Sequence, residues 1–279
     1  MLSAGGESTA FSGDDDPELV GDALPFALKL YEMLLSQDPH NAALALSTGQ
    51  AFTSYASAFV LTPSGELPVE QFDSQQAMRM RAKQLFLRAR GYIMSALDDR
   101  RPGFSEVLDK KGVDEALKMV KRDDIDYLFW LGASWLGAFG SDPFDFSLLI
   151  TVPRAVAMLT TVARWDETYG RGGVHELLIS FYGSAPADLG GDVALARESF
   201  EKAVRWSKGL KAGPYVALAS TVDIQSQNYT EFKDLLEKAL AIDVNADPAD
   251  KLENVINQRH AKWLLDHADD LFLSTGDDS

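Results

Sequence analysis

The sequence predicts an all-α fold of irregular tetratricopeptide-like helical repeats, packed into a compact bundle with a capping C-terminal helix. Two observations carry this prediction. Apolar residues recur at helical spacing along most of the 279-residue chain, and no segment shows the sustained two-residue alternation of a strand. In addition, Ala196, Phe200 and Ala203 form an A-x3-F-x2-A spacing, which is typical of the second helix of a tetratricopeptide unit.

This spacing recurs along the chain in increasingly degenerate copies. Its small residues let a neighbouring helix approach closely, and the larger middle residue fills the gap. One such unit cannot bury its apolar face alone, so we expect neighbours stacked around it. The intervals between copies differ widely from the usual repeat of about 34 residues, which favours a closed bundle over an even superhelix. The further copies are Ala27, Tyr31 and Leu34; Ala82, Phe86 and Ala89; Ala155, Leu159 and Val162; and Phe232, Leu236 and Ala239.

Proline, glycine and capping residues divide the chain into helices. Asp123 or Asp124 is expected to cap one of them, and Pro153 should kink or restart another. We predict a single all-α domain over 17–273, between a flexible segment 1–16 and a polar tail 274–279. The predicted helices are 17–21, 23–37, 42–61, 70–97, 113–120, 125–139, 147–169, a pair within 172–207, 214–224, 229–242 and 249–273.

The composition excludes several classes of function. The net charge is −16, from 42 acidic and 26 basic residues, which argues against a nucleic-acid partner. There is no cysteine, and therefore no disulfide, zinc–thiolate site or cysteine nucleophile. No run of about 18 apolar residues is present, so we expect no membrane-spanning helix. The N-terminus lacks the charged and apolar regions of a signal peptide.

The sequence motivates no catalysis, no cofactor and no metal site. His175-Glu176 begins like a zincin motif, but Ile179 occupies the position of the second histidine. His260 and His267 are seven residues apart on one helix, too far to ligate one metal together. The simpler interpretation is that His175 lies at the start of a helix and hydrogen-bonds a neighbouring loop. We therefore expect a protein that is not an enzyme.

The helices 42–61, 125–139 and 174–182 contain more apolar and aromatic residues than the rest of the chain. In an ordinary repeat protein, about half of the residues in such helices would be polar. Two interpretations remain open: a dense core, and an apolar pocket or tunnel. The candidate tunnel-lining residues are Phe52, Tyr55, Phe59, Phe129, Trp130, Trp135, His175, Leu178, Phe181 and Tyr182.

Four stretches together resemble one family. They cover 11–35, 48–60, 172–186 and 190–209, and the GGVHELLISFYGS segment within them is the most specific. They are similar to the T component (TatT) associated with tripartite ATP-independent periplasmic (TRAP) transporters, over nearly the whole chain.

This resemblance implies a periplasmic lipoprotein, anchored through a lipobox cysteine that this chain does not contain, so membrane contact would be through that anchor only. It implies a homotrimer whose subunits each carry a tunnel-like cavity. It also implies docking of the periplasmic substrate-binding P subunit and passage of a hydrophobic ligand. The alternative is a tetratricopeptide adaptor that binds a protein or peptide partner in an open groove, without a small-molecule ligand.

Overall fold

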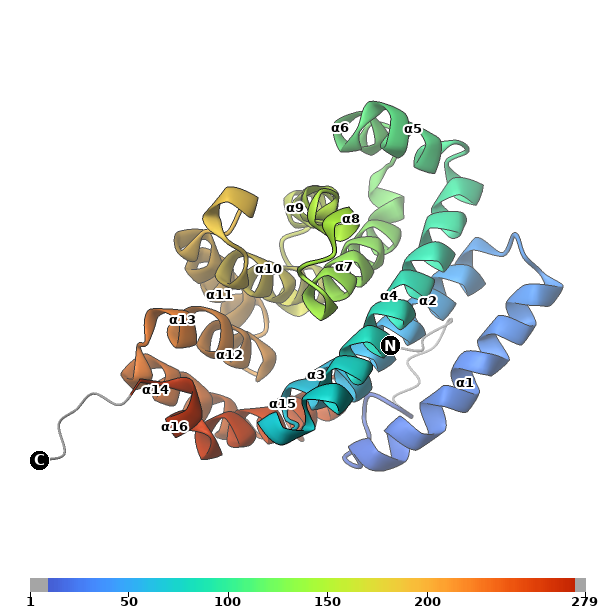
Figure 1. Ribbon diagram of the computed structural model, residues 1–279. Helices are drawn as coiled ribbons and strands as arrows, with labels where there is room; N and C mark the ends of the chain where they lie inside the picture. The colour runs from blue at the N-terminus through green and yellow to red at the C-terminus, as the bar shows by residue number, and fades with distance from the viewer. Residues whose placement is uncertain (1–9, 274–279) are drawn as a thin grey trace, which may run out of the picture. The chain divides into compact units, whose positions relative to one another are not determined.

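The structure is a computed structural model that describes residues 10–273. These residues form helices joined by short turns and contain no β-strand, so the predicted all-α class is confirmed (Figure 1). The contacts between backbone positions divide the chain into two compact units. Unit 1 comprises 10–11 and 18–166, and unit 2 comprises 12–17 and 167–273. Most of the predicted flexible segment, 1–9, and the predicted tail, 274–279, lie outside the described residues.

In unit 1, the long helix α4 packs between α2 and α7, and α7 packs in turn against α9. Short helices connect these elements. The bounds are α1 Pro17–Gln37, α2 Ala42–Ala56, α3 Thr62–Gly65, α4 Phe72–Arg100, α5 Phe104–Lys111, α6 Val113–Leu117, α7 Ile125–Ser141, α8 Phe146–Leu149 and α9 Val152–Trp165.

Local chemistry explains where the helices of unit 1 begin and end. The Asn41 side chain accepts a hydrogen bond from the Leu44 N–H and so caps α2. The predicted helix 42–61 is divided, because the chain after Ala56 forms a π-helical turn, Ser57–Leu61. The predicted restart at Pro153 is observed: this proline lies in the first turn of α9, where it costs no hydrogen bond.

The core of unit 1 is built on the predicted spacing. Ala82, Phe86 and Ala89 of α4 are all buried. The close approach of α2 to α4 depends on Gly49, because a Cβ atom there would lie 2.3 Å from the Cγ1 atom of Ile93. The small residues of the sequence pattern therefore mark real helix contacts.

Unit 2 contains two helix pairs and a cap. Helix α10 packs on α11, α12 packs on α14, and α15 covers both α12 and α14, as expected of the capping helix. Near the start of the chain, the Ser12 carbonyl accepts a hydrogen bond from the Leu252 N–H, 2.8 Å away. The bounds are α10 Gly173–Ser184, α11 Val193–Trp206, α12 Gly213–Leu218, α13 Ile224–Ser226, α14 Tyr229–Leu240, α15 Lys251–Asp266 and α16 Ala268–Leu271.

One helical run, Phe146–Trp165, is long and apolar enough to cross a membrane by length and composition alone. The sequence interpretation above did not anticipate it. Within this run Val152, Leu159 and Val162 are fully buried, and α9 packs against α7. This burial is what a core helix of unit 1 requires.

Candidate functional site

Six of the predicted tunnel-lining residues lie in unit 1. Phe52, Tyr55 and Trp135 are buried in the core. The remaining three, Phe59, Phe129 and Trp130, are only half-buried. The rings of Phe129 and Trp130 meet edge to face with their centroids 5.2 Å apart, and the rings of Tyr55 and Phe59 stack at 5.9 Å.

The other four predicted residues lie in unit 2, on α10. His175, Leu178 and Phe181 are buried, and Tyr182 is half-buried against Phe181. In each group, the half-buried rings leave part of their surface uncovered: Phe59, Phe129 and Trp130 in unit 1, and Tyr182 in unit 2.

His175 makes the hydrogen bond to a neighbouring loop that the sequence predicted for it. Its Nε2 atom lies 3.0 Å from the backbone carbonyl of Glu167, in the loop before α10. Burial, aided by the charge of Lys202, lowers the pKa of His175. The ring is therefore neutral at pH 7, and its Nε2–H donates to the carbonyl.

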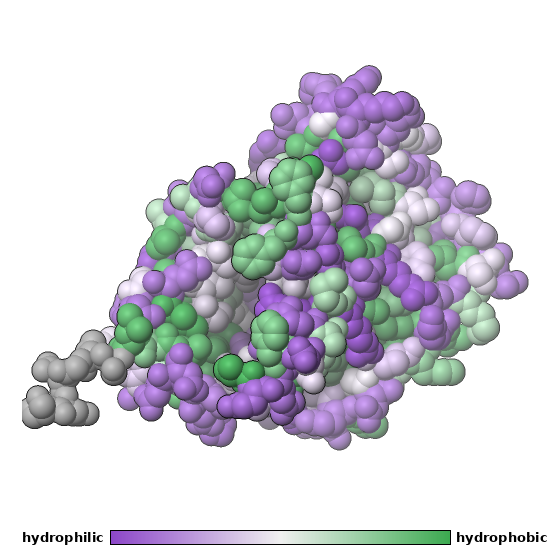
Figure 2. Space-filling model, viewed as in Figure 1, coloured by the Kyte–Doolittle hydropathy of each residue, from purple (hydrophilic) through white to green (hydrophobic). Residues whose placement is uncertain are grey.

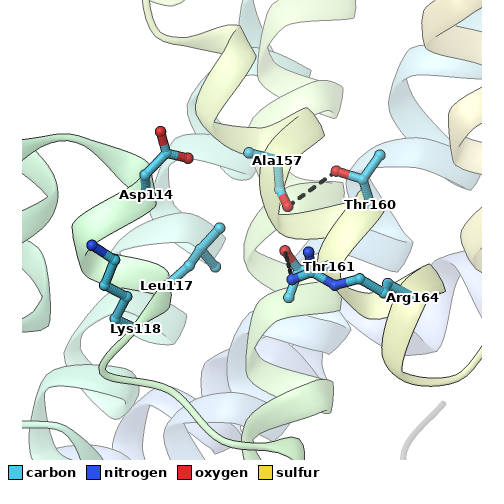
Figure 3. Close-up of a pocket in the computed structure, with 7 residues that line it drawn as sticks. All are labelled: Asp114, Leu117, Lys118, Ala157, Thr160, Thr161 and Arg164. Atoms are coloured by element: carbon cyan, nitrogen blue, oxygen red, sulfur yellow. Dashed lines mark hydrogen bonds between the residues drawn. The ribbon is translucent and has the colours of Figure 1, made fainter.

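A pocket of about 360 Å³ lies in unit 1 between α6 and α9 (Figure 3). Its lining is largely polar, and it contains none of the ten predicted tunnel residues. The Thr160 hydroxyl is turned back onto the carbonyls of Val156 and Ala157. This pocket therefore does not have the apolar lining of the tunnel that the family resemblance implied. It is lined by Asp114, Leu117, Lys118, Ala157, Thr160, Thr161 and Arg164.

Unit 2 contains a buried charge cluster that the sequence interpretation missed. The Lys211 ammonium group, almost fully buried, lies 2.9 Å from a carboxylate oxygen of Glu253 and 3.7 Å from one of Glu176. Burial raises the pKa of Glu176 to about 7, although the charge of Lys211 acts in the opposite direction. The cluster joins α10, the turn before α12, and α15.

A second ion-pair group lies in the same unit. Arg171, held in a left-handed backbone conformation at φ 54°, forms ion pairs with Asp247 and Asp250. Nothing in the local sequence distinguishes Lys211 or Asp250 from a solvated charge, since other charged residues such as Lys208 and Lys251 stand close to them in the chain. Their partners come from segments distant in the sequence, which is why only the folded chain shows them.

The outer surface of α1 carries a stripe of exposed apolar side chains, which we call the α1 stripe. It consists of Phe26, Leu30, Met33 and Leu34, with Phe26 being 75% exposed. The spacing of three and four residues places them on one side of the helix. In Figure 2, apolar residues (green) show at the surface where α1 lies in Figure 1. The opposite arc of α1 is buried, through Val20, Leu24, Leu28 and Leu35.

No group of three or more His, Cys, Asp or Glu residues suited to a metal ion occurs within residues 10–273. The paired helices and their buried contacts define a helical, repeat-like protein.

Comparison with known proteins specifies the family. The family model of the TRAP transporter T-component matches residues 13–272, so this chain belongs to that family. A Treponema pallidum (strain Nichols) protein, described as an uncharacterized protein, is 34% identical over 266 residues, covering 94% of this chain and 82% of that protein. Family membership implies an accessory, periplasmic, transport-associated protein rather than a known type of enzyme.

Proposed function

We propose that this protein is a non-enzymatic scaffold of a TRAP-type transport system. In this role it forms a homotrimer, docks periplasmic substrate-binding subunits, and holds or passes a hydrophobic ligand. The observation that carries the proposal is the family match across residues 13–272, which includes both units.

Self-association is supported by the α1 stripe. Exposed apolar patches of this kind on a folded chain commonly mark contact surfaces. The opposite arc of the same helix is buried through Val20, Leu24 and Leu28, so the stripe faces away from the core of unit 1. A trimer would place one such stripe from each copy in contact with a neighbour.

A place for a hydrophobic ligand is supported by the half-buried aromatic side chains. Phe129 and Trp130 in unit 1 and Tyr182 in unit 2 present ring surface that the protein covers only in part. Aromatic side chains contribute large apolar area to ligand sites. A lipid anchor, as the family resemblance implies, would hold the protein at a membrane surface, in keeping with a periplasmic scaffold.

The decisive experiment is native mass spectrometry of this protein with and without a periplasmic substrate-binding subunit of a TRAP transporter. The proposal expects a three-copy assembly, a further mass for each docked subunit, and a small apolar mass that leaves on collisional activation. A monomer that fails to bind the subunit would overturn the scaffold role. A trimer that binds the subunit but carries no small mass would support the scaffold role and contradict the ligand role. Binding of short peptides by a monomer would favour the adaptor alternative.

A further inference from the structure

We propose that the connector between α7 and α9 is a contact surface for an anionic lipid bilayer. The connector presents three exposed apolar side chains, Phe144, Phe146 and Ile150, which we call the connector patch. It would be a second membrane contact, besides the lipid anchor that the family resemblance implies. The patch does not depend on the transport role proposed above, because every contact behind it lies within unit 1.

The connector patch projects into solvent. Phe144 is 95% exposed, Phe146 is 71% exposed and Ile150 is 60% exposed. The Ile150 N–H donates to the Phe146 carbonyl, 3.1 Å away, so one helical turn places these two residues on the same side. Between them, Leu148 is buried, and α8 packs against α7. The short helix α8 therefore has a core side and an apolar solvent side, and apolar residues show at the surface around α8 in Figure 2.

Ion pairs hold the base of the connector. The ammonium group of Lys83, on α4, is almost fully buried and lies 2.8 Å from a carboxylate oxygen of Asp142 and 2.5 Å from one of Asp145. Asp145 also accepts a hydrogen bond from the Ser147 N–H, 2.8 Å away, and so caps α8. The bond from Lys83, followed by that from Ser147, holds the pKa of Asp145 well below its usual range. Both carboxylates beside the rings are therefore paired with a cation.

Further hydrogen bonds fix the two ends of the connector. At the end of α7, Arg79 donates through Nε to the Ser141 carbonyl at 3.3 Å and through Nη2 to the Gly140 carbonyl at 3.1 Å. At the start of α9, the Thr151 hydroxyl accepts a hydrogen bond from the indole Nε1 of Trp135, 3.2 Å away. The patch is therefore formed before any partner arrives, which lowers the entropy cost of binding.

The surroundings of the patch are basic, although the whole chain has a net charge of −16. The stretches 74–97, in α4, and 127–165, from α7 to α9, together contain seven basic and two acidic residues. These helices are neighbours, since α4 packs on α7 and α7 packs on α9. From outside the two stretches, Glu32 and Asp109 each pair with one of the seven cations, and the balance stays positive.

This local balance favours a negatively charged partner. At physiological ionic strength, exposed charges more than about 8 Å apart are largely screened, so the acidic residues elsewhere on the chain have little effect at the patch. Anionic headgroups attract basic residues that lie near a membrane surface. The charge around the connector patch is thus complementary to an anionic bilayer.

The shape of the patch favours a bilayer over a protein surface. Phe144 and Phe146 stand out from a turn, where they are largely exposed, and do not line a groove. A bilayer interface takes up apolar side chains to a depth of about 5–10 Å and needs no matching hollow. A second copy of this chain, or another protein, would have to offer a cavity for both rings. Exposed apolar surface of this kind, with cations beside it, is suited to the membrane interface.

The test is co-sedimentation of the full chain with vesicles of phosphatidylcholine, alone or with about 30% phosphatidylglycerol. We expect the mixed vesicles to bind the protein at least about threefold more strongly, and added salt to remove that difference. Phe144→Ser with Phe146→Ser should weaken binding to the mixed vesicles about tenfold or more. Val69→Ser is the matched control, because Val69 is 87% exposed elsewhere in unit 1, and it should bind like the wild type.

Circular dichroism verifies that each variant is folded. No binding of the wild-type protein to the mixed vesicles, or equal binding by the wild type and the folded double variant, would overturn the proposal. Equal binding to the two kinds of vesicle would overturn the preference for anionic lipid.

A fluorescent label locates the contact. Because the chain has no cysteine, Phe144→Cys provides a single attachment point for the environment-sensitive dye NBD. We expect its emission to shift to the blue with mixed vesicles and to be quenched by brominated lipid, whereas the same dye at Val69→Cys should show neither effect. A blue shift at position 144 that appears without vesicles and grows with protein concentration would place a second copy on the patch and overturn the proposal.

Discussion

The carboxyl group of Asp223 is completely buried, and the nearest charge-compensating group, Nη2 of Arg197, lies 3.7 Å from it. No donor among the described residues hydrogen-bonds either carboxyl oxygen. The side chains of Asp223 and Glu231 are within hydrogen-bonding reach of each other, so a protonated Asp223 can donate to the Glu231 carboxylate. Arg197 binds that same carboxylate through two contacts of 2.6 and 2.7 Å.

Asp223→Asn should therefore stabilise the protein above neutral pH. Burial, followed by the charge of Glu231, raises the pKa of Asp223 from 3.8 to about 7. Because the folded-state pKa is raised, the favourable contribution of the wild-type group is complete below about pH 4 and is lost as the pH rises to about 7. We expect a gain on the order of 2 kcal/mol in the free energy of unfolding at pH 8, and almost none at pH 4.

Urea unfolding at a series of pH values measures this difference between variant and wild type. Comparing the two chains at each pH removes the contributions of the other carboxyl groups, which they share. A difference that stays constant from pH 4 to pH 8 would contradict the raised pKa.

Asp124→Asn should destabilise unit 1. This buried carboxylate accepts bonds from Nε of Arg100 at 2.8 Å and Nε of Arg101 at 2.7 Å. Burial alone would raise its pKa, but the Lys121 N–H and the two arginines outweigh burial and lower it. The lowered folded-state pKa means that this stability is present above about pH 4 and is lost as the pH falls through the folded value.

Loss of the charge leaves both guanidinium groups without their acceptor, and we expect a cost of about 2–4 kcal/mol at pH 7. Chemical denaturation followed by circular dichroism measures it. As a control, Asp73→Asn places the same substitution at an exposed position in the first turn of α4 and should change stability by less than about 0.5 kcal/mol. Equal effects of the two substitutions would show that the Asp124 pairs contribute little.

Two glycines in contacting helices should respond in opposite directions to alanine. At Gly49 the new Cβ would lie 2.3 Å from Ile93, so α2 and α4 must separate, at a cost of about 1–3 kcal/mol. At Gly91, in the interior of α4, no atom lies within 4 Å of the new Cβ. Gly91→Ala should stabilise by about 0.5–1 kcal/mol through helix propensity. Thermal unfolding of the two variants measures both effects. A Gly49→Ala variant as stable as the wild type would contradict the close approach of α2 to α4.

Charge placed in the α1 stripe should reduce self-association. Leu30→Asp with Phe26→Asp puts two carboxylates on the proposed contact surface while leaving the buried arc of α1 intact. We expect the mass from light scattering to fall from that of a trimer to that of a monomer, with the helical content unchanged. The matched control is Phe72→Asp, at the first position of α4 and 57% exposed. An unchanged oligomer in the double variant would place the contact elsewhere.

The helices and most of their buried faces could be predicted from the sequence. The spacings at Ala82, Ala155, Ala196 and Phe232 lie on helices, and their apolar members are buried or half-buried as expected. This works because helical periodicity by itself decides which residues share a face. The bond from His175 to its preceding loop also followed from local position.

The copy of the spacing at Ala27, Tyr31 and Leu34 shows what helical periodicity does not predict. Leu34 was expected to pack with Ala27 and Tyr31, yet it is 47% exposed, while Leu28 and Leu35 take the buried positions. Periodicity defines a face of α1 but not the helix that covers it. The division into two units and the charged interior around Lys211 were likewise outside the reach of the sequence.

The sequence by itself determined the all-α class, the helix pairs and the family, because these depend on residue spacing and on motifs read along one segment at a time. Only the tertiary structure decided which charges found partners. Arg81, Arg88 and Arg90 are nearly alike in sequence context, but the first two meet Tyr55 and Glu32 and the third meets only the face of Trp135. The partners of these three arginines come from distant parts of the chain, so the spacing of residues along α4 carries no information about them.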